Sequence, residues 1–129
     1  MSSKVAVPSL VAMMVVAALL VPQTVQAAGD PAKGRAQFSS KCSICHSAEA
    51  GQDEVGPSLA GVVGRKSASE PKFAYSAAMK SYDQTWDEKT LDTYLTNPRQ
   101  AVPGTKMVFL GLKNQSDRDD LIAYLATLK

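Results

Sequence analysis

The apolar positions of the chain change their spacing from one segment to the next. The first of them form an unbroken run over Leu10–Val21. Later, apolar residues recur three and four positions apart, in the segments Leu91–Leu95 and Leu121–Leu128. This spacing is typical of helices with one buried face. No stretch alternates polar and apolar residues for long enough to indicate a strand. The pattern therefore predicts an all-α fold.

Residues that favour helix ends divide the second part of the chain. Asp30 followed by Pro31 predicts the start of a helix, and Pro98 limits how far the third helix can extend. The pair Ser116 and Asp119 has the spacing of a capping box. The expected helices run from Pro31 toward Lys41, over Tyr75–Lys80, from Asp87 to Asn97 at the latest, and from Ser116 onward.

The N-terminal segment has the three parts of a secretory signal peptide. Lys4 precedes the apolar run Leu10–Val21, and small residues end at Ala27 and Ala28, where we expect cleavage after one or the other. The run is shorter than the roughly 18 residues of a spanning helix, although an uncleaved anchor is the alternative. We expect a signal peptide over residues 1–28 and one domain over residues 29–129.

The net charge and the length of the chain narrow the range of possible functions further. The chain carries a formal net charge of +2, and Lys4 contributes one of these charges within the signal segment. A nearly neutral domain of this kind argues against binding to nucleic acid. A chain this short also has a limited core, so a large covalently held apolar cofactor would add to it.

The chemistry is concentrated in Cys42-Ser43-Ile44-Cys45-His46, the C-x-x-C-H pattern that attaches a c-type haem. One helical turn presents both sulfurs to the same edge of a porphyrin, where each forms a thioether with a vinyl group. His46, the only histidine in the chain, then lies where it can ligate the iron. Haem is attached outside the cytoplasm, in agreement with a signal peptide.

Three other uses of Cys42 and Cys45 compete with haem attachment. A zinc site needs about four ligands, so a carboxylate would have to join these cysteines and His46. A thioredoxin-like redox pair is expected near a βαβ pattern, for which no strand is predicted. A structural disulfide between residues so close in sequence closes a small loop and stabilises little. Haem attachment remains the favoured interpretation.

A haem that transfers electrons usually has a second axial ligand, and a methionine thioether raises its potential. Outside the signal segment only Met79 and Met107 remain. Met79 lies in a predicted helix and is interpreted as core packing. Met107 follows the turn signal of Pro103 and Gly104, and a loop can carry a thioether to an iron. We therefore prefer Met107.

These motifs together resemble the class I cytochromes c, namely mitochondrial cytochrome c and the bacterial cytochromes c2. The resemblance covers Gly29 to Lys129. The matching motifs are Cys42-Ser43-Ile44-Cys45-His46, Gly56-Pro57-Ser58-Leu59, Gly64-Arg65-Lys66, Thr85-Trp86, Pro103-Gly104-Thr105-Lys106-Met107 and Asp120-Leu121-Ile122-Ala123-Tyr124-Leu125. It implies a few helices and loops wrapped around one haem c, attached through Cys42 and Cys45.

The resemblance also implies how the two axial ligands, His46 and Met107, are supported. Pro57 would accept a hydrogen bond from the outer nitrogen of His46, which fixes the tautomer. Tyr94 would lie behind Met107 and orient its sulfur.

Four further residues are implied to hold the haem propionates. Arg65, Tyr75 and Trp86 would bind the buried propionate through charge and through O–H or N–H donation. Thr105 would contact the region of the other propionate.

The resemblance implies one contact between the ends of the domain. Gly34 and Phe38 would pack against Leu121 and Tyr124, where the first and last helices cross.

The function expected on this basis is that of a soluble periplasmic mono-haem electron carrier between respiratory or photosynthetic complexes, without catalysis and as a monomer with no permanent membrane anchor. Lys41 and Lys106, next to the ligand motifs, would favour redox partners with acidic docking surfaces. Such partners include a cytochrome bc1 complex, a terminal oxidase, a reaction centre or a dehydrogenase. The alternatives are a dedicated electron donor or acceptor of one periplasmic dehydrogenase, and an open-site haem sensor or peroxidase-like protein.

Overall fold

The computed structural model describes residues 29–129, so the expected signal peptide or anchor over residues 1–28 lies outside the described part of the chain. The elements are α1 (Pro31–Gln37), the π-helix η1 (Phe38–Cys42), α2 (Ala77–Tyr82), α3 (Glu88–Thr96), α4 (Pro98–Ala101) and α5 (Gln115–Leu125). Within residues 29–129 the only strand-like pairing is an isolated bridge between Lys66 and Thr85. The all-α prediction is therefore confirmed. No helix in this range is long and apolar enough to cross a membrane.

The first predicted helix is present, but it changes from an α-helix to a π-helix along its length. Asp30 caps it by accepting hydrogen bonds from the N–H groups of Ala32 and Lys33, and Pro31 occupies the first turn, as expected. After Gln37 the helix continues directly as η1, where the Ser43 N–H donates to the Phe38 carbonyl five residues earlier. This wider turn ends at the first cysteine of the haem-attachment pattern.

The next two helices agree with the sequence to within two residues. Helix α2 begins at Ala77 rather than Tyr75, because the Ser76 side chain caps it and accepts from the Met79 N–H. Helix α3 lies where it was predicted. Asp87 is its N-cap, bound to the Thr90 N–H at 2.7 Å.

The N-cap of the last helix, expected at Ser116, was predicted wrongly. Helix α5 begins at Gln115, and Asn114 is its N-cap, since the Asn114 side chain accepts from the Ser116 N–H at 2.9 Å. Asparagine is as good a cap as serine, and here it takes that place two residues earlier. The short helix α4 was not anticipated, although Asn97 caps it as well.

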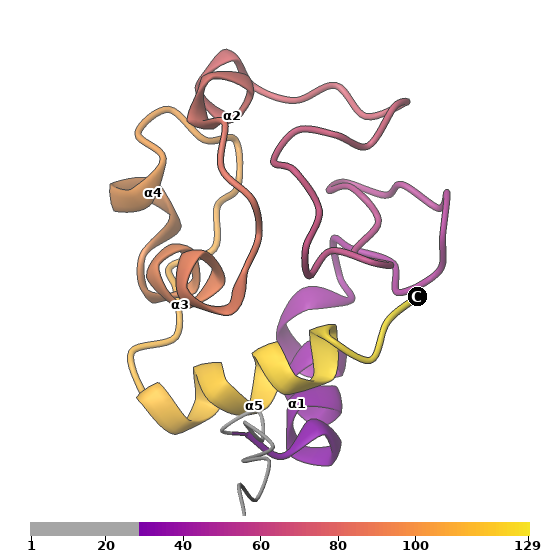
Figure 1. Cartoon of the computed structure of the whole chain (residues 1–129), viewed down its shortest axis with the longest axis vertical. Helices are drawn as coiled ribbons and strands as arrows, with labels where there is room; N and C mark the ends of the chain where they lie inside the picture. Colours follow the sequence, from indigo (N-terminus) through magenta and orange to yellow (C-terminus); the bar gives the residue numbers. More distant parts are fainter. Residues whose placement is uncertain (1–28) are drawn as a thin grey trace, which may run out of the picture.

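Helices α1 and α5 pack against each other in the lower part of the view, and the other helices of residues 29–129 lie above them (Figure 1). A Cβ at Gly34 would overlap the Asp120 carbonyl oxygen, so only glycine permits this approach. The rings of Phe38 and Tyr124 pack at 5.4 Å between centroids. The contact implied by the resemblance is therefore present.

A buried arginine connects three parts of the fold. Arg118 of α5 is 6% exposed and donates to the carbonyls of Leu112 (2.8 Å) and Lys113 (3.1 Å). It also pairs with Asp92 of α3 at 2.6 Å and donates to Gln115. Burial alone would raise the pKa of Asp92, yet hydrogen bonds from Arg118 and Gln115 hold that pKa below its usual value. Arg118 thus ties α3 and α5 to the segment that follows Met107.

We expect Arg118→Leu to lower the free energy of unfolding by about 3 kcal/mol, because it leaves two carbonyls and a carboxylate without their donor. Urea unfolding followed by circular dichroism measures this loss. Arg35→Leu is the matched control, since Arg35 is exposed on α1 and should cost no more than about 0.5 kcal/mol. Equal losses for the two variants would contradict the structural role of Arg118.

Candidate functional site

The two cysteines lie on one tight turn at the end of η1. The N–H groups of Cys45 and His46 both donate to the Cys42 carbonyl, at 3.0 and 2.9 Å. Both thiols are free and partly buried. Burial raises the pKa of Cys42 to about 11, with Lys41 opposing the shift and Cys45 adding to it. Cys42 is therefore a protonated thiol at neutral pH.

These properties weigh against two of the other uses of the cysteines. A thioredoxin-like pair depends on a thiol with a lowered pKa, whereas the pKa of Cys42 is raised. No group of three or more His, Cys, Asp or Glu side chains within residues 29–129 is arranged to hold a metal ion. A zinc site at Cys42 and Cys45 thus lacks its further protein ligands.

His46 is held in one orientation by the loop that follows it. Its Nδ1 lies 2.7 Å from the Pro57 carbonyl, and because a carbonyl only accepts, Nδ1 carries the proton. The N–H of Gly56 donates to the Cys45 carbonyl at 2.7 Å, and a Cβ at Gly56 would overlap the imidazole. Burial lowers the pKa of His46, although the Pro57 hydrogen bond opposes this. The ring is therefore neutral, and its Nε2 is available to a metal.

Met107 is supported by Tyr94 of α3 and by Thr105. The Tyr94 hydroxyl lies 3.4 Å from the Met107 sulfur and 3.4 Å from Thr105 Oγ1. Thr105 also accepts from the Met107 N–H at 3.3 Å. Burial raises the pKa of Tyr94, with the Thr105 hydrogen bond opposing it, so the phenol stays protonated and can donate. The structure thus brings Tyr94, Thr105 and Met107 together.

Met79, the alternative ligand, is a core residue. It is 9% exposed and belongs to the same buried cluster as Trp86 and Tyr94. Met107 by contrast is only partly buried and packs against the edge of that cluster. The burial of the two methionines matches the preference for Met107.

Two of the three residues expected at the buried propionate are joined by their side chains, and the third is joined through its backbone. The Trp86 backbone N–H donates to the Arg65 carbonyl at 2.9 Å. Arg65 pairs with Glu70 at 2.9 Å, and the Glu70 N–H donates to the Tyr75 hydroxyl at 3.3 Å. Arg65 also donates to the Ser58 carbonyl at 2.8 Å. Arg65 and Tyr75 therefore meet at Glu70, whereas Trp86 joins Arg65 only through the backbone and its ring packs against Tyr94 in the core.

Sequence reasoning missed the supports behind these residues. Ser58 is fully buried; its hydroxyl donates to the Glu49 carbonyl at 2.6 Å and its N–H to Asp53 at 2.9 Å. Ser58 thereby fixes the loop that presents Pro57. Serine and arginine are mostly surface residues, and only the position of Ser58 directly after Pro57 hinted at its role. Nothing in the sequence singled out Arg118.

The residues present fit a haem c. Two free thiols separated by two residues, an imidazole with one free nitrogen and a thioether are the donors that such a group requires. Leu59, Tyr75 and Phe109 are only partly buried against the core, which leaves apolar surface that a porphyrin would cover.

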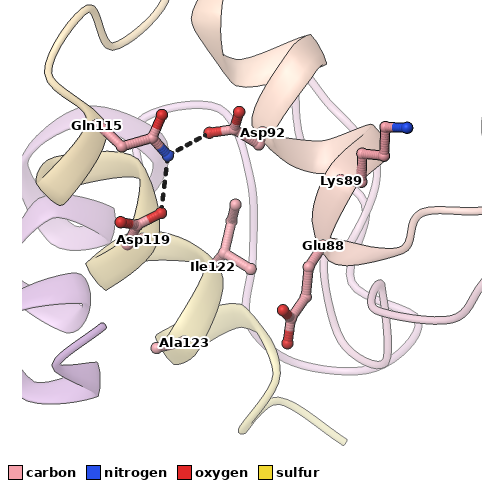
Figure 2. Close-up of a pocket in the computed structure, with 7 residues that line it drawn as sticks. All are labelled: Glu88, Lys89, Asp92, Gln115, Asp119, Ile122 and Ala123. Atoms are coloured by element: carbon pink, nitrogen blue, oxygen red, sulfur yellow. Dashed lines mark hydrogen bonds between the residues drawn. The ribbon is translucent and has the colours of Figure 1, made fainter. Parts of the chain in front are cut away.

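A surface depression of about 210 Å³ between α3 and α5 is a separate feature (Figure 2). Gln115 donates to both Asp92 and Asp119, at 2.9 and 2.8 Å. The two carboxylates are thus already partnered. None of the residues expected to bind haem lines this depression, so it is not part of the candidate site.

Comparison with known proteins assigns the chain to a family. The family model described as Cytochrome c matches residues 31–129. Cytochrome c2 of Rhodomicrobium vannielii is 55% identical over 115 residues, which are 88% of this chain and 91% of that protein. Cytochrome c of Euglena viridis is 46% identical, covering 78% of this chain and 99% of the relative. The structure of cytochrome cH from Methylobacterium extorquens is 43% identical, with a TM-score of 0.72 over 77% of this chain and 99% of that one. The chain belongs to the cytochrome c family, as a class I cytochrome c.

Proposed function

We propose that this protein is a periplasmic one-electron carrier with a single haem c attached through Cys42 and Cys45. His46 and Met107 would hold its iron. When bound, the haem supplies an iron that accepts and returns one electron. The observation that carries this proposal is the support of both ligands: Pro57 leaves Nε2 of His46 free, and Tyr94 donates toward the sulfur of Met107.

The chain's own residues would keep this iron in a fixed environment. Ligands that do not move between oxidation states keep the reorganisation on electron transfer small, and the hydrogen bonds to His46 and Met107 oppose such movement. Arg65, Tyr75 and Trp86 would hold one propionate, and Thr105 would contact the other. The existing partner of Arg65, Glu70, is 2.9 Å away. A propionate would therefore share Arg65 with that carboxylate.

Export is tested by the mass of the mature protein. We expect periplasmic material to begin at Ala28 or Gly29 and to carry the mass of one haem, because residues 1–28 have the pattern of a signal peptide. Intact-mass spectrometry measures both features together. A Cys45→Ser variant should keep one thioether, whereas a Cys42→Ser/Cys45→Ser variant should lose the covalent haem. A colourless protein, or one that retains Met1 in the membrane fraction, would contradict the proposal.

The proposed partners are redox proteins with acidic docking surfaces, such as a cytochrome bc1 complex or a terminal oxidase. Lys41 and Lys106 are exposed next to Cys42 and Met107. Neither forms an ion pair within residues 29–129; they donate to Gln37 Oε1 and the Ala74 carbonyl instead. Their charges are thus available to steer a partner.

We expect Lys41→Glu/Lys106→Glu to slow association with such a partner roughly tenfold at low salt, because opposite steering charges act mainly on the on-rate. Stopped-flow oxidation by a purified terminal oxidase measures this. The difference should shrink as salt rises, since screening acts over roughly 8–10 Å near physiological ionic strength. Lys33→Glu, a change of the same kind on exposed α1, is the control. Equal rates for both variants would exclude a steering role for Lys41 and Lys106.

A further inference from the structure

Three aromatic rings lie one after another between the end of α2 and the Met107 sulfur. The rings of Tyr82 and Trp86 are 5.6 Å apart between centroids, and those of Trp86 and Tyr94 are 4.9 Å apart. Separations of roughly 4.5–7 Å are those of aromatic rings in contact. The Tyr94 hydroxyl in turn lies 3.4 Å from the Met107 sulfur. The folded chain thus holds a continuous row of three rings that ends at the proposed iron ligand.

The outer ring of this row is the one that solution reaches. Trp86 is 8% exposed and Tyr94 is 7% exposed, so both rings are enclosed by the core. Tyr82 is only partly buried and is the last residue of α2. A small molecule in solution therefore meets the row at Tyr82.

All three rings can give up one electron. Tyrosine and tryptophan are the aromatic side chains that strong one-electron oxidants attack most readily, whereas the phenyl ring of phenylalanine resists them. The other two aromatic pairs of residues 29–129 each contain a phenylalanine, and they are Phe38 with Tyr124 and Phe73 with Tyr75. In this part of the chain, the row that begins at Tyr82 is therefore the one in which every ring in contact can be oxidised.

The backbone fixes the contact between the two outer rings. The Trp86 N–H donates to the Arg65 carbonyl, and the Trp86 carbonyl accepts from the Gly64 N–H, both at 2.9 Å. Asp83, which follows Tyr82, has a left-handed backbone with φ of 48° and pairs with Lys66. The chain turns sharply at this residue, which lets rings four positions apart pack against each other.

We propose that Tyr82, Trp86 and Tyr94 form an electron relay, through which the electron stored by this carrier reaches small one-electron oxidants that collide with Tyr82. The oxidants it fits are free radicals strong enough to take an electron from a phenol. The order of the rings follows from their contacts alone. The source of the electron rests on the proposed function, because it comes from a haem whose iron binds Met107.

The outer step exchanges one electron and one proton. The radical takes an electron from the Tyr82 ring and becomes an anion, while the phenolic proton leaves to water. Burial raises the pKa of Tyr82, and Asp87 adds to the shift, so the phenol keeps this proton until the ring is oxidised. An electron from Trp86 then restores the Tyr82 ring, which takes a proton back from water.

The inner steps return every ring to its starting state. Tyr94 gives an electron to Trp86 while its phenolic proton stays in the hydrogen bond to Thr105. The stored electron then restores Tyr94. The net result is that the radical gains one electron and the reduced carrier loses one, and no bond of the protein is changed.

The test compares the reduced holoprotein with its Tyr82→Phe variant. Azide radicals made by pulse radiolysis are the probe, and the haem absorption reports oxidation of the iron. We expect a first-order phase of haem oxidation, with a rate independent of protein concentration, that is lost in Tyr82→Phe. Direct attack of the radicals on the haem depends on concentration and should be the same in both proteins.

Tyr124→Phe is the matched control. Tyr124 is also partly buried, but its ring neighbour is Phe38, so the row of oxidisable rings does not continue there. The first-order phase should therefore persist in this variant. Loss of the phase in both variants, or in neither, would overturn the proposal.

A second readout locates the damage left by the radicals. In the oxidised holoprotein no stored electron is available, so peptide mass spectrometry after the same pulse should find more oxidation of Tyr82 than in the reduced holoprotein. Tyr124 should be modified equally in the two states. Equal modification of Tyr82 in both states would contradict the relay. Failure of the proposed function would look different, because the protein would then show no haem absorption before the pulse.

Discussion

Replacing Met107 by alanine should lower the reduction potential of the holoprotein by on the order of 0.1 V or more, within the roughly 0.8 V range that axial ligands span. The thioether is a soft donor that favours the reduced iron, and the alanine methyl group offers no donor atom. The weak red charge-transfer absorption of methionine-ligated ferric haem should vanish, and the iron should become open to small ligands such as cyanide. Spectroelectrochemistry measures the potential and the band in one titration.

Met79→Ala is the natural control, because Met79 lies in the core at 9% exposure. It should keep the red band but lose about 2–4 kcal/mol of stability, as large-to-small core substitutions do. Tyr94→Phe should keep the band as well, since it removes the hydroxyl that lies 3.4 Å from the sulfur but not the sulfur itself. If Met79→Ala abolished the band and Met107→Ala preserved it, the assignment of the ligand would be wrong.

A side chain at Gly34 should be the most damaging change away from the haem site. Gly34→Val should destabilise the protein by about 3 kcal/mol or more, because even a Cβ there overlaps the Asp120 carbonyl and crowds Tyr124. The helices α1 and α5 would have to separate, which uncovers Phe38. Guanidinium unfolding followed by far-UV circular dichroism measures the loss.

Ala36→Val provides the comparison on the same helix. Ala36 is exposed on α1, so its replacement carries the helix-propensity cost of valine, below about 1 kcal/mol, without the steric one. Similar losses for the two variants would show that the crossing of α1 and α5 tolerates a side chain at position 34.

Local signals in the sequence located most of the helices. Asp30, Asp87 and the stop at Pro98 each act within a few residues, so their effect can be read from the chain alone. The start of α5 was misplaced because Asn114 and Ser116 are both good caps, and tertiary packing selects between them. The π turn at Phe38 carries no sequence signal at all.

Some residues of the candidate site could likewise be predicted from local signals in the sequence, and others could not. Spacing alone predicts Cys42, Cys45 and His46 as site residues, because haem attachment needs them on one turn. The choice of Met107 over Met79 rested on the type of segment, and the burial of the two side chains agrees with it. The roles of Ser58 and Arg118 could not be predicted, since each depends on carbonyl groups that only the folded chain brings near.

The crossing of α1 and α5 can form only late in the synthesis of the chain, because the two helices lie near opposite ends of residues 29–129. The Asp30 N–H donates to the side chain of Asp120, ninety residues later, so the helix that is synthesised first must wait for the one synthesised last. Until Gln115–Leu125 has been synthesised, the turn with Cys42 and Cys45 belongs to a chain in which the contact between α1 and α5 is still open. A chain that ends before Gln115 would never close this contact, and its first helix would keep its apolar face in water.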